Sequence, residues 1–288
     1  MQWTQLEPGT LVTQRRKLDF GTVVLRRRQY QTAFRGDGVI PEGRTLFGLT
    51  SGKPSTTRWA GLEVSCDDIA TTRGRVDVFT RAPETHYAIV VDDNAFRECG
   101  LPESVCETLK HVPSCPSLVR SAHARHLRDY VRGLLEPGFF SGWLSKTSAC
   151  KNVLWLLAAA VGTDGEPLEP TRPQGRRIAA VRLCQEYIEQ KMADAVTLSD
   201  LSLVSGLRPR TLINAFEAVT GTSPMAFLRA RRLCRVRTVL ESAHSERIRI
   251  IDVAIDWGFW HMGHFTSAYR TMFGETPSET LSRCTRAR

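Results

Sequence analysis

The clearest hydrophobic pattern lies near the C-terminus, where apolar positions recur at helical spacing over residues 251–273. It predicts a short helix over 251–256 and a second helix over 261–273. Gly258 separates them, because glycine accepts the positive φ that ends a helix at no steric cost. One face of the second helix is apolar at every fourth position, and the other carries small or polar groups. The apolar positions are Phe265, Tyr269 and Phe273.

The same pattern occurs once before in the chain, over residues 200–224. The offset between the copies is 52 residues at the start and 53 at the end, so the second copy has one extra residue. A repeat of this kind indicates two copies of one supersecondary unit. The matched pairs are Gly206 and Gly258, Leu207 and Phe259, Phe216 and Tyr269, Gly221 and Gly274, and Pro224 and Pro277.

A short helix, a glycine turn and a second helix with one apolar face are typical of a helix-turn-helix. The second helix of such a motif fits the major groove, where base edges present a distinct pattern of donors, acceptors and methyl groups. An ordinary hairpin in an all-α core has the same pattern, but two copies favour DNA binding. A long helix beginning at Ser223-Pro224 is predicted to fix their separation. Its arginines are candidates for phosphate contact or for pairing with acidic neighbours: Arg229, Arg231, Arg232, Arg235 and Arg237.

Three motifs in this region carry a family resemblance. They are G-L-R-P-R-T-L from Gly206, R-R-L from Arg231, and H-F-T-S-A-Y from His264, followed by F-G-E-T-P. Together they resemble the AraC/XylS family of bacterial transcription regulators over about residues 178–283. The chain departs from the family pattern at Val236, at Tyr269 and at Trp260–Gly263; these departures bear on the preferred DNA sequence and not on the fold.

The resemblance implies which residues contact DNA. In the first recognition helix, expected over 208–219, Arg210, Ile213 and Asn214 match the family's base-reading positions. Small, weak donors dominate the second helix, so the first hairpin is expected to carry most of the sequence discrimination and the second to position the protein. The complete predicted DNA-binding set is Arg208, Arg210, Thr211, Ile213, Asn214, Met262, Gly263, His264, Thr266, Ser267 and Arg270.

Residues 1–92 lack helical periodicity and show short apolar or alternating runs between glycines and prolines. Such runs predict strands, and many short strands with regular turns suggest a small barrel or β-sandwich. The family resemblance implies a cupin-like sensor domain here. A metal-binding cupin is disfavoured because His86 is the single histidine in this region. The predicted strands cover 22–30, 45–49, 60–65, 76–80 and 87–91.

Helical patterns follow, and they define the domain organisation. Helices are predicted over 95–99, 103–109, 118–135 and 143–161; the last two either form a dimer interface or simply cover the sheet. Residues 162–175, rich in proline and glycine, are predicted to be a linker. Residues 176–192 should open the DNA-binding domain, with Thr197 as the cap of the next helix. The expected fold class is α+β: a cupin-like β-barrel sensing and dimerisation domain over 1–161, the linker, and an all-α domain with two helix-turn-helix motifs over 176–288.

Arginines on the predicted strands and helices are candidates for binding an anionic effector. Arg26 and Arg28 share one face of a strand and Arg27 takes the other. A guanidinium fork suits phosphate, so a cyclic dinucleotide such as c-di-GMP is one candidate effector. Solvated surface charge, which protects an edge strand from aggregation, is the favoured alternative. The candidate set is Arg26, Arg27, Arg28, Arg35, Arg128 and Arg132.

The charge and composition support a DNA-binding regulator. The net charge is +9, and from Arg172 onward 18 basic residues face 11 acidic ones, which favours phosphate attraction. The eight cysteines contain no C-x-x-C pair, so neither a metal site nor a cofactor is implied. No secretory signal or apolar run of membrane-spanning length is visible, so we expect a cytoplasmic bacterial protein.

Two functional hypotheses result. The first is a transcription activator that responds to a small molecule, acts as a homodimer on promoter DNA and contacts RNA polymerase. The alternative is a DNA-binding domain fused to a repair enzyme or other enzymatic module. Because no nucleophile elbow, phosphate loop or paired catalytic carboxylates appear, we expect the protein not to be an enzyme.

Overall fold

A computed structural model describes residues 2–9, 12–51, 56–81, 83–100, 102–103, 107, 112–113, 115–137, 145–163, 165–242 and 248–286. The chain forms two compact units. Within the described ranges, the first comprises residues 1–2, 12–31 and 36–170. The second comprises residues 3–11, 32–35 and 171–288, so it includes two short segments from the N-terminal part of the chain.

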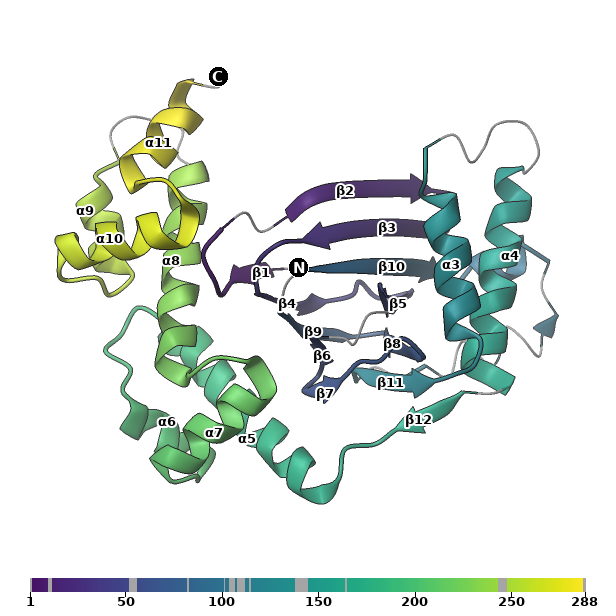
Figure 1. Cartoon of the computed structure of the whole chain (residues 1–288), viewed down its shortest axis with the longest axis horizontal. Coiled ribbons are helices and arrows are strands. Elements are labelled where there is room, and N and C mark those ends of the chain that lie inside the picture. Colours follow the sequence, from purple (N-terminus) through teal and green to yellow (C-terminus); the bar gives the residue numbers. More distant parts are fainter. Residues whose placement is uncertain are drawn as a thin grey trace. The chain divides into compact units, whose positions relative to one another are not determined.

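The first unit is built on a seven-stranded sheet (Figure 1). The strand order is β12-β11-β8-β5-β10-β3-β2, and each pairing with a defined register is antiparallel. The strands are β2 (Val12–Asp19), β3 (Val23–Tyr30), β5 (Arg44–Thr50), β8 (Asp68–Thr72), β10 (Glu84–Asp92), β11 (Ser117–Arg120) and β12 (Glu166–Leu168).

A second sheet has five strands in the order β1-β4-β9-β6-β7. The prediction of an antiparallel β-sheet region followed by a helical region is confirmed, while closure into a cupin-like barrel stays a prediction. The strands are β1 (Gln2–Gln5), β4 (Phe34–Val39), β6 (Thr57–Trp59), β7 (Leu62–Glu63) and β9 (Arg75–Thr80).

The predicted strands 22–30, 45–49, 76–80 and 87–91 correspond to β3, β5, β9 and β10. The predicted strand 60–65 is shorter, because Ala60 takes a φ of 49° and Gly61 a φ of 85° in a turn between β6 and β7. Helix α1 (Ala95–Glu98) lies where a helix was expected. Most of the predicted helix 103–109 lies outside the described residues.

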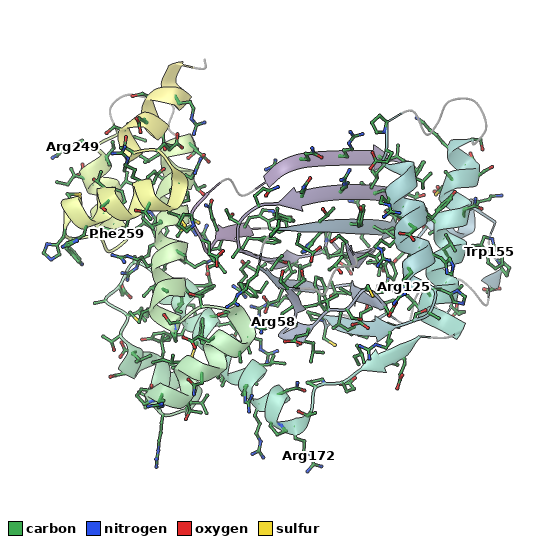
Figure 2. All side chains as sticks on the ribbon, viewed as in Figure 1. Arg58, Arg125, Trp155, Arg172, Arg249 and Phe259 are labelled. Carbon is green, nitrogen blue, oxygen red and sulfur yellow. The ribbon has the colours of Figure 1, made fainter. Side chains whose placement is uncertain are left out.

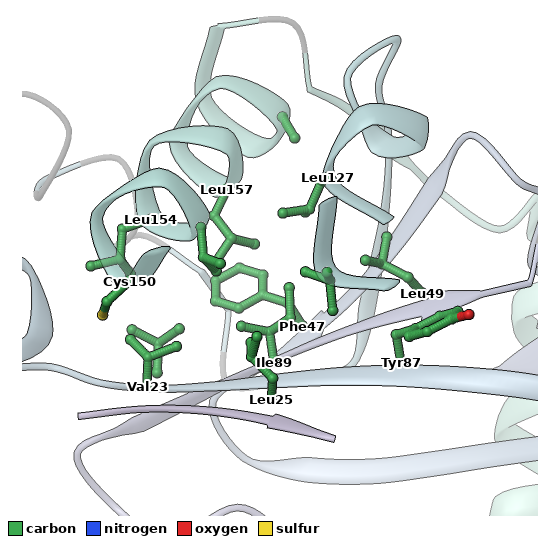
Figure 3. Packing of buried hydrophobic residues seen from close by; sticks show 14 of the residues in the cluster. Val23, Leu25, Phe47, Leu49, Tyr87, Ile89, Leu127, Cys150, Leu154 and Leu157 are labelled. Carbon is green, nitrogen blue, oxygen red and sulfur yellow. The ribbon is translucent and has the colours of Figure 1, made fainter. Parts of the chain in front are cut away.

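Two helices, α3 (Ala124–Leu134) and α4 (Lys146–Ala158), cover one face of the seven-stranded sheet. Their inner side chains form a core with alternate residues of the strands, and Figure 3 shows Phe47 among Leu127, Leu154 and Leu157. Covering the sheet is therefore one role of this pair. The predicted helix 118–135 begins later, because Ser117–Arg120 pairs with β8 as strand β11.

Residues 162–175 differ from the linker that their composition predicts. A π-helical turn, Ala159–Thr163, follows α4, and β12 then pairs with β11. Helix α5 (Arg172–Lys191) begins within the same range and is capped by Thr171, whose hydroxyl accepts from the amide of Gln174. The helix that opens the second unit thus starts four residues earlier than predicted.

The second unit contains seven helices within its described residues. Helix α8 runs between α5–α7 and α9–α11 (Figure 1). Its side chains enter two cores: Phe227 and Leu228 pack with α5–α7, and Leu233, Val236 and Leu240 pack with α9 and α10. The remaining bounds are α6 (Leu198–Ser205), α7 (Pro209–Thr220), α8 (Pro224–Ser242), α9 (Ile250–Asp256), α10 (Met262–Phe273) and α11 (Pro277–Arg286).

Two buried arginines join the N-terminal segments of the second unit to its helices. Arg231 of α8 is 3% exposed and bonds to Thr4 and to Glu189 of α5. Arg35 is 2% exposed, and its Nη2 donates to Gln185 Oε1 at 2.9 Å. A buried charge needs such partners, because desolvation without them is costly.

Candidate nucleic-acid interface

The two hairpins have the same backbone geometry at their turns. Gly206 follows α6 with φ 66°, and Gly258 follows α9 with φ 77°. Both recognition helices also end alike, at Gly221 and Gly274, each with φ 74°. These are left-handed conformations that favour glycine, so the duplicated glycines of the sequence specify duplicated turns.

The first recognition helix, α7, has a buried and an exposed face. Leu212, Ala215 and Phe216 are each at most 2% exposed and pack against α5 and α6. Arg208 stands at the N-cap, and Pro209 occupies the first helical turn. Of the predicted DNA-binding residues here, Ile213 is half-buried and the others are exposed: Arg208, Arg210, Thr211 and Asn214.

The second recognition helix, α10, is organised in the same way. Phe265 and Tyr269 are buried, and the Tyr269 hydroxyl donates to Thr280 Oγ1 of α11 at 3.0 Å. Burial raises the pKa of Tyr269 to about 12. Met262 is half-buried and packs on the hydrophobic core of this hairpin. The other predicted residues are exposed: Gly263, His264, Thr266, Ser267 and Arg270.

The arginines of the linking helix α8 have different environments. Arg231 and Arg235 both pair with Glu189, and Arg237 pairs with Glu241 and Glu275. Arg232 donates to backbone carbonyls. Arg229 alone of the five predicted phosphate-contact candidates is exposed, and it has no ion pair within the described part of the chain. Pairing with acidic neighbours, one of the two predicted roles, therefore accounts for three of them.

The six arginines predicted for effector binding form separate groups. Arg27, Arg128 and Arg132 surround the phenol of Tyr87, whose pKa burial raises while these charges lower it. Arg27 pairs with Glu136 at 3.1 Å, Arg132 lies 3.4 Å from Asp129, and Arg128 Nη1 donates to the Cys66 carbonyl at 2.9 Å.

The other three lie elsewhere. Arg26 and Arg28 project to the opposite face of β3, where Lys17 and Arg15 of β2 are their direct cross-strand neighbours. Arg35 belongs to the second unit and stacks 5.3 Å from the Phe227 ring centroid. The structure therefore does not bring the six together in one site.

Two further properties concern the described residues only. No set of three or more His, Cys, Asp or Glu side chains among them is arranged to hold a metal ion. None of the helices within the described ranges combines the length and apolar character that a bilayer span requires.

Comparison with known proteins bears on residues 201–283, which match the model of a helix-turn-helix domain. A Pseudomonas putida protein, XylDLEGF operon transcriptional activator 2, is 40% identical over 97 residues, which cover 34% of this chain and 62% of the relative. Its helix-turn-helix region belongs to the AraC/XylS family of transcriptional regulators. This agrees with the prediction of a DNA-binding regulator for this part of the chain.

Two other proteins match a similar share of the chain. The transcriptional regulator ExsA of Pseudomonas aeruginosa is 32% identical over 100 residues, which cover 35% of each chain. The solved structure of a probable AraC family regulator from Rhodopseudomonas palustris is 38% identical, covers 37% of this chain and 97% of that one, and has a TM-score of 0.35. The chain thus spans less than two thirds of the length of the curated relatives it matches.

The sequence pattern did not identify every residue that shapes this AraC/XylS-type domain. Trp257 is half-buried and packs against both cores of the second unit, and Arg232 contacts segments from both hairpins. Periodicity cannot reveal such contacts, because it reports only which face of one helix is buried. The adjacency of Trp257 to the turn glycine Gly258 was the one available signal.

Proposed function

We propose that this protein is a sequence-specific transcription activator that reads promoter DNA with two recognition helices, α7 and α10. The observation that carries the proposal is the duplicated hairpin within one compact unit, with the matching polar faces of both recognition helices exposed. The same family contains the P. putida proteins named as operon activators, which favours activation over repression.

The proposed chemistry of recognition differs between the helices. Arg210 offers a fork that matches guanine O6 and N7, and Asn214 one that matches adenine N6 and N7. The exposed groups of α10 are mostly weak or single donors, such as Thr266 and Ser267. We therefore assign most base discrimination to α7 and mainly positioning to α10.

An anionic small molecule is proposed to control the activator. Arg15, Lys17, Arg26 and Arg28 form one basic face across β2 and β3, on which Lys17 pairs with Asp19 at 2.7 Å. Like charges placed opposite each other on neighbouring strands destabilise a sheet, and a bound anion would relieve this. A cyclic dinucleotide such as c-di-GMP has the required charge.

The homodimer and the contact with RNA polymerase also belong to this proposal. Trp155 on α4 supports a dimer surface on the outer side of α3 and α4, because its side chain is 48% exposed (Figure 2). Burying the exposed apolar surface of this indole against a partner would favour association.

The substitution Arg210→Ala tests the recognition assignment. Loss of a bidentate contact should weaken binding to a specific promoter site at least about tenfold, and to random DNA much less. Affinities are measured by fluorescence anisotropy at one fixed salt concentration, because phosphate contacts depend on salt.

Arg182→Ala is the matched control, since it removes the same charge from an exposed site on α5 of the same unit. It should leave the ratio of specific to random affinity unchanged. Equal losses on both DNAs for Arg210→Ala would reject the assignment of Arg210 to base reading.

A further inference from the structure

One side chain of the second unit, Arg232, holds carbonyl groups that belong to different parts of the fold. Its Nε donates to the Met192 carbonyl at 2.8 Å, and its Nη2 donates to the Asp194 carbonyl at 2.6 Å. Both carbonyls follow α5, the opening helix of the first hairpin's domain. The Arg232 guanidinium is thus bonded to the segment that leads from α5 into the first hairpin. Burial lowers the pKa of this guanidinium.

The same guanidinium also packs on the turn of the second hairpin. Its Nη1 lies 3.5 Å from the Gly258 carbonyl, and a Cβ placed on Gly258 would lie 2.9 Å from the Arg232 Cζ atom. The equivalent glycine of the first hairpin, Gly206, would meet nothing within 4 Å. Gly258 therefore leaves room for the guanidinium of Arg232, whose end would have to shift if a Cβ stood there, in addition to accepting the positive φ.

A second contact joins the hairpins at the same place. Trp257, which precedes Gly258, packs against the core of α5–α7 and also against the core of α9 and α10. Along α8, Leu228 enters the first core and Leu233 the second, so little more than one helical turn separates them. Arg232 lies within that turn, where bending would change the mutual orientation of the hairpins.

We propose that Arg232 is a positioning residue that holds the two recognition helices in one mutual orientation. It joins the end of α5 to the Trp257–Gly258 turn through a fork of donors, and it acts through these segments rather than by touching DNA. The inference rests on the proposed function and deepens it, because two linked readers gain affinity together only when their geometry fits both sites.

The test uses full-length protein and a DNA site that the wild type selects from a randomised duplex library. Versions with one or the other half-site scrambled are compared with the intact site. Arg232→Ala should lose about tenfold in affinity for the intact site, while binding to either single half-site changes less than about twofold.

Arg229→Ala is the matched control, since it removes the same charge from an exposed position of the same helix. We expect it to weaken all three DNAs equally and to reduce the slope of log affinity against log salt by about one, as a phosphate contact does. Arg232→Lys keeps the charge but cannot reproduce the fork, so it should behave like Arg232→Ala. Arg232→Ala results that match those of Arg229→Ala would overturn the proposal.

A thermodynamic cycle tests the contact without DNA. Gly258→Ala should lower the thermal midpoint of the wild type by more than that of Arg232→Ala, because removing the guanidinium makes room for the new Cβ. Equal decreases of the thermal midpoint in both proteins would show that Arg232 does not pack on Gly258. A wild type that selects no DNA refutes the proposed function instead, and this cycle then still decides whether Arg232 holds Gly258.

Discussion

His86 shows how one residue reports on the packing of the first unit. Its Nε2 lies 3.1 Å from the hydroxyl oxygens of both Thr57 and Thr80, and its ring packs edge-on against Tyr30. Burial, and secondly the charge of Arg28, lowers its pKa from 6.5 to about 3. The folded chain therefore holds a neutral imidazole where the unfolded chain binds a proton below pH 6.5.

The pH dependence of stability follows from this shift. The contribution of His86 is fully present above pH 6.5 and is lost as the pH falls toward 3, because only the unfolded state gains the proton. At pH 5 the loss should approach about 2 kcal/mol. The measurement is the urea midpoint of the first unit's unfolding at pH 7 and pH 5.

His86→Gln provides the comparison, since it keeps a hydrogen-bonding side chain without titrating in this range. Its stability should fall less between pH 7 and pH 5 than that of the wild type. Carboxylates titrate in both proteins, so the difference isolates the imidazole. Identical decreases would show that His86 is not held neutral by the fold.

Strands β2 and β3 carry the basic face proposed for the effector. Arg26 is exposed on that face, whereas Arg27 points to the other face and pairs with Glu136. If an anion binds the basic face, c-di-GMP should raise the thermal midpoint of the wild type, and Arg26→Ala should abolish the increase. Differential scanning fluorimetry on full-length protein measures both.

Arg27→Ala serves as control, because it removes an equal charge from the neighbouring position on the opposite face. It should retain the increase that c-di-GMP gives to the wild type. If the wild type shows no increase, c-di-GMP is not the effector and solvated charge explains the cluster. An increase that survives Arg26→Ala would place the anion elsewhere.

The elements that the sequence predicted well are those whose signals are local. The hairpins follow from turn glycines such as Gly206 and Gly258 and from aromatic residues at helical spacing, and α6, α7, α9 and α10 form where expected. Thr197 caps α6 as predicted, with its hydroxyl accepting from the Asp200 amide. Each of these features depends on residues within one or two helical turns.

Elements that depend on distant partners were missed or displaced. Ser117–Arg120 forms a strand because Leu118 and Val119 pair with Ala70 and Ile69, so tertiary pairing overrides the helical pattern that follows. Glu166–Leu168 has little apolar character, and it forms a strand by pairing with Ser117–Arg120. Neither partner can be read from the local sequence.

At the scale of the whole molecule, the sequence predicted the order of a β-rich region and a helical DNA-binding region but not all the contacts within each unit. The linking helix α8 has 19 residues, about 28 Å at 1.5 Å per residue, which is comparable to one turn of DNA. Thr4 bonds to Arg231 of this helix, Arg35 lies over its Phe227 ring, and its Arg232 donates to the Met192 carbonyl. Their partners lie far along the chain, so no spacing rule identifies them.

The central claim is that α7 and α10 read one DNA duplex at the same time. Hydroxyl-radical footprinting and methylation interference of the full-length protein on its selected DNA test it most directly. The account predicts two contacted boxes in successive major grooves, about 10 base pairs apart on one side of the duplex. A single box, or two boxes on opposite sides of the DNA, would contradict it.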